Sequence, residues 1–315
     1  MPDISLQNFE TDLIQASMQQ PVLLDIWAPW CGPCKALGPV LEKLETDYAG
    51  RFTLAKLNAD EQPEISNQLS QMFGVRSIPF CVLFKGGQPV DGFVGALPES
   101  EVRTFLDKHV PSAAESAATS EVASAELLLA DGDVDTAIEK LQAAVTLDPG
   151  NDTARYDCLR ALLGAGRVPE ARIAYAPVAS KIMPDPRLAA CGHWLEALER
   201  TEGGRSEEQL EAALSVDKRD FDARFERAQR QFAAQDFGAA MDELLEILMR
   251  DKGWRDGVAR KTYVAILEIM SRPGAAKYAG QVTRDETLEV ANKSRVVSTD
   301  PIADGYRRKL SMVLF

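Results

Sequence analysis

A pair of cysteines set between a buried strand and a helix constrains the fold of this chain most. The run Val22–Trp27 is apolar except for Asp25, as expected for a strand covered on both faces. Cys31-Gly32-Pro33-Cys34 follows, and leucine and valine then recur at helical spacing over residues 37–44. Backbone N–H groups at a helix start favour a thiolate. We therefore expect Cys31 to be the attacking nucleophile and Cys34, more buried, to resolve the mixed disulfide.

The other elements of residues 1–110 alternate between strand and helix patterns. Thr53–Leu57 is a second strand, and the helix before it makes a βαβ unit with parallel strands. Phe80–Phe84 and Val90–Val94 flank a glycine-containing turn and predict a hairpin. An amphipathic helix ends near Val110. The predicted order is α-β-α-β-α-β-β-α, an α/β domain.

The remainder of the chain has a helical repeat. Gly132 and Gly166 lie 34 positions apart in two predicted turns, and Ala137 and Ala171 show the same spacing. This is the tetratricopeptide period, in which each helix hairpin buries its apolar face only against its neighbours. We expect an all-α tetratricopeptide-like repeat domain. The expected boundaries are a linker over 111–120, repeats over 121–270, an irregular segment over 271–305 and a C-terminal amphipathic helix over 306–315.

Composition narrows the partners and the compartment. The net charge of −13 and the pI near 4.8 argue against nucleic acid and against anionic membrane surfaces as partners. No apolar run approaches the roughly 18 residues of a membrane span, and the first ten residues do not form a secretory signal. Five cysteines in so long a chain do not make a disulfide scaffold. We expect a cytoplasmic protein.

Residues 3–110 resemble thioredoxin, on the strength of residues 27–35, 58–60 and 74–79. The resemblance implies that Pro79 is a cis-proline packed against the cysteine pair and that the backbone of Ile78 pairs with an extended substrate. It places Asp25 behind Cys34, near Lys56, as the proton acceptor when Cys34 attacks. A carboxyl buried in this way should have a raised pKa. The catalytic residues implied are Cys31, Cys34, Asp25 and Lys56, and the substrate-binding residues are Trp30, Gly32, Pro33, Ile78, Pro79 and Gly95.

The order of the two domains, with residues 220–225, 251–257 and 306–310, resembles the bacterial chaperedoxin family (YbbN/CnoX type). That resemblance implies a redox-linked chaperone of the bacterial cytoplasm, active under stress. It would bind unfolded or oxidised client proteins, protect their cysteines through mixed disulfides with Cys31 and Cys34, and pass them to the chaperonin, with other chaperones as further partners. The alternative is a thioredoxin-like protein-disulfide reductase, whose repeats select substrates and which cycles with thioredoxin reductase.

Several sequence features have a second interpretation. The cysteine pair could be a relic or half of a metal site, but no second Cys or His pair completes a zinc tetrahedron, so we expect neither metal nor cofactor. Small buried apolar roles suffice for Cys81, Cys158 and Cys191. The aromatic residues of the repeats could line a binding surface, although core positions are more usual. The C-terminal helix either caps the last repeat or docks on a partner through Tyr306, Leu310, Val313 and Leu314.

Overall fold

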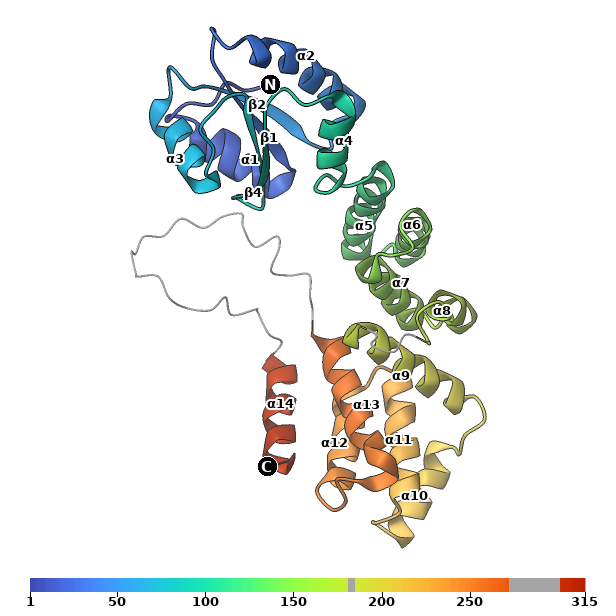
Figure 1. Ribbon diagram of the computed structural model, residues 1–315. Helices are drawn as coiled ribbons and strands as arrows, with labels where there is room; N and C mark the ends of the chain where they lie inside the picture. The colour runs from blue at the N-terminus through green and yellow to red at the C-terminus, as the bar shows by residue number, and fades with distance from the viewer. Residues whose placement is uncertain (181–184, 272–300, 315) are drawn as a thin grey trace. The chain divides into compact units, whose positions relative to one another are not determined.

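The computed structural model describes residues 1–180, 185–271 and 301–314. The chain divides into two compact units, Met1–Thr119 and Ser120–Phe315, which are described separately (Figure 1). The predicted irregular segment 271–305 lies largely outside the described residues.

The first unit is built on a four-stranded sheet with the order β2-β1-β3-β4. The strands are β1 (Val22–Trp27), β2 (Thr53–Asn58), β3 (Phe80–Lys85) and β4 (Gln88–Val94). β1 runs parallel to β2 and antiparallel to β3, and β3 pairs with β4 as a hairpin. The helical segments are η1 (Phe9–Gln15), α1 (Ala16–Gln19), α2 (Gly32–Asp47), α3 (Pro63–Phe73) and α4 (Glu99–Asp107). The order of elements predicted from the sequence is confirmed.

Each face of this sheet carries its own apolar core, because alternate residues of a strand point to opposite sides. Leu23 of β1 packs with the leucines of α2 and with α4, whereas Leu24 packs with η1 and α3. The polar Asp25 of β1 is 2% exposed. It has the same parity as Leu23, so its side chain is directed to the face that α2 covers.

Helix α5 (Ala113–Asp131) takes in most of the segment that the sequence suggested as a linker. The division between the two units, after Thr119, falls inside it. Alanine has the highest helix propensity of all residues, so an Ala- and Ser-rich composition does not by itself prevent a helix.

The described residues of the second unit form helices joined by short turns and contain no strand. Its further helices are α6 (Val134–Leu147), α7 (Asp152–Gly164), α8 (Val168–Tyr175), α9 (Pro186–Thr201), α10 (Glu207–Val216), α11 (Phe221–Ala233), α12 (Phe237–Leu248), α13 (Trp254–Met270) and α14 (Pro301–Leu314). Gly132 and Gly166, the two turn residues 34 positions apart, have φ of +85° and +71°. This left-handed region favours glycine and explains both positions. Ala137 and Ala171 are fully buried, as the helix-hairpin interpretation requires.

Short polar side chains determine where most of these helices begin. Six of them accept a hydrogen bond from a backbone N–H in the first turn: Asp133, Asn151, Asp185, Ser206, Asp220 and Asp236. Such caps satisfy donors that have no partner inside the helix. The sequence therefore fixes the starts of the hairpin helices locally.

The packing of the last helices differs from a simple stack of hairpins. α13 contacts α12 and also α9, which lies two hairpins earlier, while α9 contacts α11 and α11 contacts α12. Trp194 of α9 fills the shared interior, with its ring centroid 6.0 Å from that of Phe232 and 5.8 Å from that of Phe237. Four helices therefore close around one core (Figure 1). The expectation that each hairpin packs only on its neighbours is wrong here.

Helix α14 begins at Pro301, before the predicted residue 306. The hydroxyl of Tyr306 donates to the Gly238 carbonyl oxygen at 3.2 Å, and the hydroxyl of Tyr263 donates to the Tyr306 carbonyl oxygen at 2.8 Å. Leu310 and Val313 also pack against the repeat core. Of the two alternatives for this helix, the contacts show capping of α12 and α13.

Candidate active site

Cys31 and Cys34 form a disulfide at the start of α2. Cys31 occupies the N-cap position, and the Cys34 backbone N–H donates to its sulfur at 3.2 Å. Gly32 and Pro33 form the first helical positions, where the missing N–H of proline costs nothing. The backbone therefore already directs a donor at the Cys31 sulfur, as the stabilisation of a thiolate requires.

The two cysteines are buried to the same extent, with 3% and 4% of their surfaces exposed. The expectation that Cys34 would be clearly the more buried of the two is wrong for this disulfide form. Ala28 belongs to the same cluster, and the side chains of Trp27 and Ile78 pack against it. These neighbours cover both sulfur atoms of the disulfide, so neither cysteine is clearly more exposed to solvent than the other.

The loop beside the disulfide contains a cis peptide bond between Ile78 and Pro79. The cis-proline implied by the resemblance to thioredoxin is confirmed. The Pro79 carbonyl oxygen accepts a hydrogen bond from the Gly95 N–H at 2.8 Å. The backbone N–H and C=O of Ile78 make no hydrogen bond to any residue in the described part of the chain. An extended peptide could use both groups.

A groove of about 600 Å³ lies next to this loop. Trp30 and Ile78 line it, together with residues 74–77 and polar side chains of α3: Ser66, Asn67, Ser70 and Gln71. The Trp30 side chain is 71% exposed, and its indole N–H donates to an Asp60 carboxylate oxygen at 3.0 Å. Among the predicted substrate-binding residues, Gly32, Pro33, Pro79 and Gly95 do not line this groove. Gly32 and Pro33 are exposed beside the disulfide.

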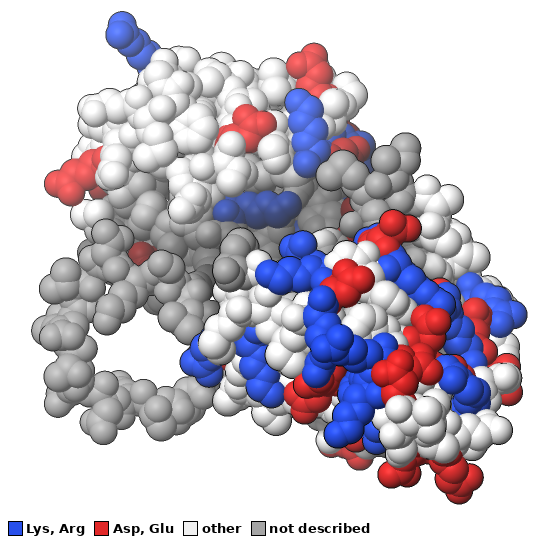
Figure 2. Space-filling view, turned by 90° about the horizontal axis from the view of Figure 1, so that it is seen from below, with Lys and Arg blue, Asp and Glu red and all other residues white. Residues whose placement is uncertain are grey.

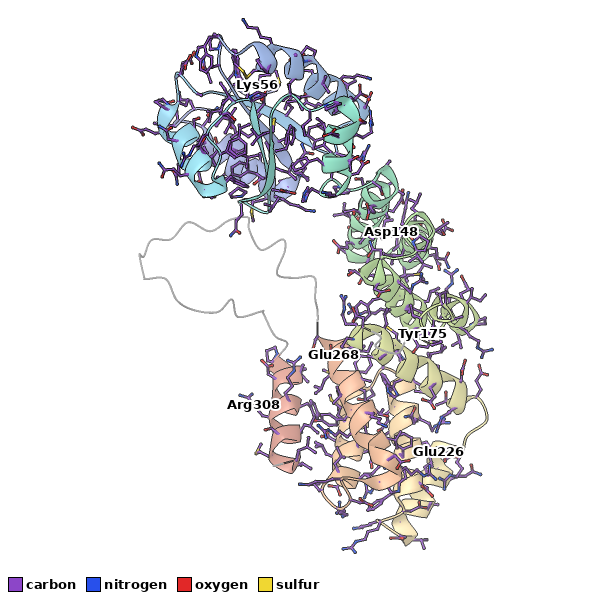
Figure 3. The ribbon with its side chains drawn as sticks, viewed as in Figure 1. Lys56, Asp148, Tyr175, Glu226, Glu268 and Arg308 are labelled. Atoms are coloured by element: carbon purple, nitrogen blue, oxygen red, sulfur yellow. A yellow bond between two sulfur atoms is a disulfide. The ribbon has the colours of Figure 1, made fainter. Side chains whose placement is uncertain are left out.

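Asp25 lies on the interior strand β1, with Lys56 opposite it on β2 and Cys81 opposite it on β3. Burial raises the pKa of Asp25 from 3.8 to about 6, and the hydrogen bond from Cys81 and the charge of Lys56 oppose that rise. The Lys56 ammonium, labelled in Figure 3, lies 2.8 Å from the Glu42 carboxylate. The lysine therefore acts on Asp25 through its charge, while its hydrogen bond goes to Glu42.

Sequence reasoning missed three residues of this site. Cys81, assigned a bland core role, has its sulfur 3.7 Å from Asp25 Oδ1. Glu42 binds Lys56, and Asp60 orients Trp30. The available signal for Cys81 was its place in the strand after Pro79. Its contact with Asp25 also depends on the pairing of β3 with β1, which belongs to the tertiary structure and has no local sequence signal. Asp60 was part of the thioredoxin-like sequence without a role attached.

The other cysteines and the histidine that could have chemical roles lie in surroundings that suit a structural role. Cys158 and Cys191 are buried, and burial raises the pKa of Cys158 to about 11 and that of Cys191 to about 12. His109 lies 2.8 Å from the Asp91 carboxylate. Within the described ranges there is no group of three or more His, Cys, Asp or Glu side chains placed to hold a metal ion. No helix in the described part of the chain is long and apolar enough to cross a membrane.

Charges of both signs mix over the repeat unit. Figure 2 shows Lys and Arg side chains interspersed with Asp and Glu on the face that it presents. Many are paired, as in the contact of Arg224 with Glu243 at 2.6 Å and that of Arg205 with Glu226 at 2.7 Å. The visible face therefore offers no single-sign field of the kind that a polyanion requires.

Comparison with known proteins agrees with both units. Residues 2–108 match the family model described as thioredoxin, and residues 128–190 and 201–281 match two models described as tetratricopeptide repeat. A thioredoxin of Chlorobaculum thiosulfatiphilum is 46% identical over 104 residues, which are 33% of this chain and 91% of that protein. A thioredoxin of Synechocystis is 41% identical over 109 residues, 35% of this chain and 96% of that protein. The thioredoxin of Haemophilus influenzae is 43% identical over 103 residues, 33% of this chain and 91% of that protein.

Proposed function

Because the chain belongs to the thioredoxin family through its first unit, we propose that it exchanges thiols and disulfides with proteins and works as a redox-linked chaperone of the chaperedoxin type. The carrying observation is the Cys31–Cys34 disulfide at the start of α2, beside Ile78, whose backbone N–H and C=O have no hydrogen-bond partner among the described residues. The matches to tetratricopeptide repeats support binding of protein partners, because helix repeats present extended surfaces.

The first step forms a mixed disulfide. In the reduced protein, the Cys31 thiolate attacks one sulfur of a client disulfide, and the helix start stabilises its negative charge. A bond forms between Cys31 and the client, the client's own sulfur–sulfur bond breaks, and its second sulfur leaves as a thiolate. The Ile78 backbone and the groove beside Trp30 hold the client chain extended during attack.

The second step releases the client. Cys34 transfers its proton to the Asp25 carboxylate, and the Cys34 sulfur then attacks the Cys31 sulfur. The mixed disulfide breaks, the client leaves as a thiolate that takes up a proton, and Cys31 and Cys34 end as the disulfide of this structure. The client has gained two electrons, and a dithiol or thioredoxin reductase must return two electrons to the cysteine pair.

The second unit would hold unfolding or oxidised clients and hand them to the chaperonin or to other chaperones. A chaperonin contact through α14 would use its outer face, because Tyr306, Leu310 and Val313 pack against the repeats. Met312 is 74% exposed on that helix, and Arg308 is also exposed (Figure 3). Deletion of residues 306–315 should abolish co-purification of the chaperonin with this protein, and unchanged co-purification would refute the contact. Because the deletion also removes capping contacts, the fold of the truncated protein must be checked.

A cysteine-trapping experiment tests the redox proposal. Cys34→Ser lets Cys31 attack but prevents resolution, so clients should accumulate as adducts visible on non-reducing gels. The matched control is Cys31→Ser in the same background, which should remove every adduct. Mass spectrometry of the adducts would then identify the clients. A folded Cys34→Ser protein without adducts in its host would refute thiol–disulfide exchange as its activity.

The alternative is a plain protein-disulfide reductase, favoured by both cysteines being present and by the identity to thioredoxins. Turnover of a protein disulfide with thioredoxin reductase as electron donor separates the two functions. Fast cycling, with no suppression of client aggregation by the Cys31→Ser/Cys34→Ser double variant, indicates the reductase. Suppression of aggregation by that double variant indicates a chaperone whose repeats bind without the cysteines.

We also propose a cytoplasmic location. Three thiols, those of Cys81, Cys158 and Cys191, are free among the described residues, and none lies in a disulfide. Unpaired cysteines are usual where glutathione and thioredoxin keep thiols reduced.

A further inference from the structure

The side chain that contacts Asp25 from β3 is the thiol of Cys81. Asp25 and Cys81 are directly paired across β1 and β3, so their side chains lie on the same face of the sheet. The Cys81 sulfur is 3.7 Å from Asp25 Oδ1, with 0% of Cys81 and 2% of Asp25 exposed. Within the described ranges this is the only hydrogen bond to the Asp25 side chain.

We propose that Cys81 is a positioning residue whose thiol donates a hydrogen bond to Asp25 and orients its carboxylate for proton transfer from Cys34. The inference rests on the proposed function, in which Asp25 accepts that proton. Cys81 itself forms no bond to sulfur in either step.

The surroundings of Cys81 make it a hydrogen-bond donor and not a nucleophile. Burial, together with the negative charge of Asp25, raises the pKa of Cys81 well above its usual value. The thiol therefore keeps its hydrogen over the whole physiological pH range. Because no part of its surface is exposed, client disulfides and oxidants cannot reach the sulfur.

The other groups around Asp25 cannot replace this donor. Lys56 on β2 contributes its positive charge, but its ammonium hydrogen-bonds to Glu42 of α2. In the oxidised protein, the cysteines of α2 are joined as a disulfide and carry no thiol hydrogen. In that form, removing the Cys81 donor would leave Asp25 without a hydrogen-bond donor among the described residues, which disfavours its charged form.

The consequence concerns the pH range in which Asp25 can act. A carboxyl group accepts a proton only while it is ionised, and burial has already moved the Asp25 pKa to about 6. Loss of the thiol donor should move the pKa further toward neutrality. The Cys81 thiol therefore extends the pH range in which Asp25 is ionised toward lower pH.

The direct test is the titration of Asp25 in the full-length oxidised protein by ¹³C NMR of aspartate carboxyl groups. Asp25→Asn identifies the signal. Cys81→Val has a similar volume and no donor, and should raise the Asp25 pKa by about half to one pH unit. Cys81→Ser retains a hydrogen-bond donor, so its Asp25 pKa should stay closer to that of the parent protein. An unchanged Asp25 pKa in Cys81→Val, or equal rises in both variants, would overturn the inference.

A kinetic readout tests the consequence for Cys34. Reduced protein treated with an equimolar aromatic disulfide first releases one chromophoric thiol at Cys31 and a second when Cys34 resolves the adduct. The pH midpoint of the second release should move upward in Cys81→Val and much less in Cys81→Ser, while the first release is unchanged. A second release with the same midpoint in all three proteins would contradict the proposed role.

The two readouts separate this inference from the proposed function. If Cys34→Ser traps no clients, the proposed function fails, yet the NMR titration still decides whether Cys81 acts on Asp25. If trapping succeeds and the titration does not move, only the inference about Cys81 is wrong.

Discussion

Replacement of Asp25 by asparagine should stabilise the first unit at neutral and alkaline pH. The Asp25 pKa rises from 3.8 to about 6 on folding because the side chain is buried. A difference of about two pH units, at about 1.4 kcal/mol per unit, corresponds to about 3 kcal/mol. Asparagine cannot ionise, so Asp25→Asn should recover up to that amount, less whatever the buried amide loses for want of partners.

The sign of the pH dependence follows from proton binding. Between about pH 4 and pH 6 the folded state holds the Asp25 proton and the unfolded state has lost it. Stability of the parent protein should therefore fall as the pH rises through that window, and the full cost should be present above it. Below pH 3.8 the parent and Asp25→Asn should have similar stability.

Hydrogen–deuterium exchange with mass spectrometry measures the stability of the first unit alone, within the full-length protein, for the parent and for Asp25→Asn. Peptides from β1 and β3 report the free energy of opening of the sheet. Parent and variant are compared at the same pH, so that intrinsic exchange rates cancel. Glu64→Gln, which changes an exposed carboxylate on α3, is the matched control and should leave sheet protection nearly unchanged. Equal protection of Asp25→Asn and the parent protein at pH 8 would refute the burial argument.

Three substitutions in the second unit test its packing by urea or thermal unfolding. Gly192→Ala would place a methyl group in steric conflict with the Tyr175 hydroxyl and should cost about 1–3 kcal/mol; no loss would mean that Tyr175 moves freely. Trp194→Ala should cost about 3–5 kcal/mol, since the ring is 2% exposed at the centre of four helices, and a loss below 1 kcal/mol would contradict that packing. Asp220→Ala removes the cap on the Ala223 N–H and should cost about 1 kcal/mol, which Asp220→Asn should largely restore.

The first unit was largely predictable from its sequence because its signals are local. The run Val22–Trp27, the following cysteine pair and the two glycines of the hairpin each specify their own element. The environment of Asp25 was not predictable in the same way. Its contact with Cys81 depends on which strand lies beside β1 and in which register. No local pattern encodes that pairing.

The site shows the same division between local and tertiary information. Lys56 was expected near Asp25, and it lies opposite Asp25 on β2, but its ammonium binds Glu42 on α2. The sequence shows that Lys56 carries a positive charge, but it does not show whether the ammonium binds the Asp25 or the Glu42 carboxylate. The equal burial of Cys31 and Cys34 likewise depends on how the Ile78 loop covers the disulfide.

In the second unit, the 34-residue spacing correctly gave the turns at Gly132 and Gly166. Apolar spacing shows which face of a helix is buried, but it does not show which helix covers that face. The contact of α13 with α9 therefore had no sequence signal. The polar and alanine-rich composition of residues 111–120 suggested a part-helical linker, and α5 begins there at Ala113.

The closed arrangement of α9, α11, α12 and α13 limits how such an array can change its length. In an open stack, a hairpin can be gained or lost at the end while the interior is left as it was. Here, loss of α13 would uncover α9 as well as α12, and an additional hairpin inserted after α12 would separate α13 from α9. We therefore expect deletion or insertion of a hairpin between α9 and α13 to disrupt the packing of all four helices together.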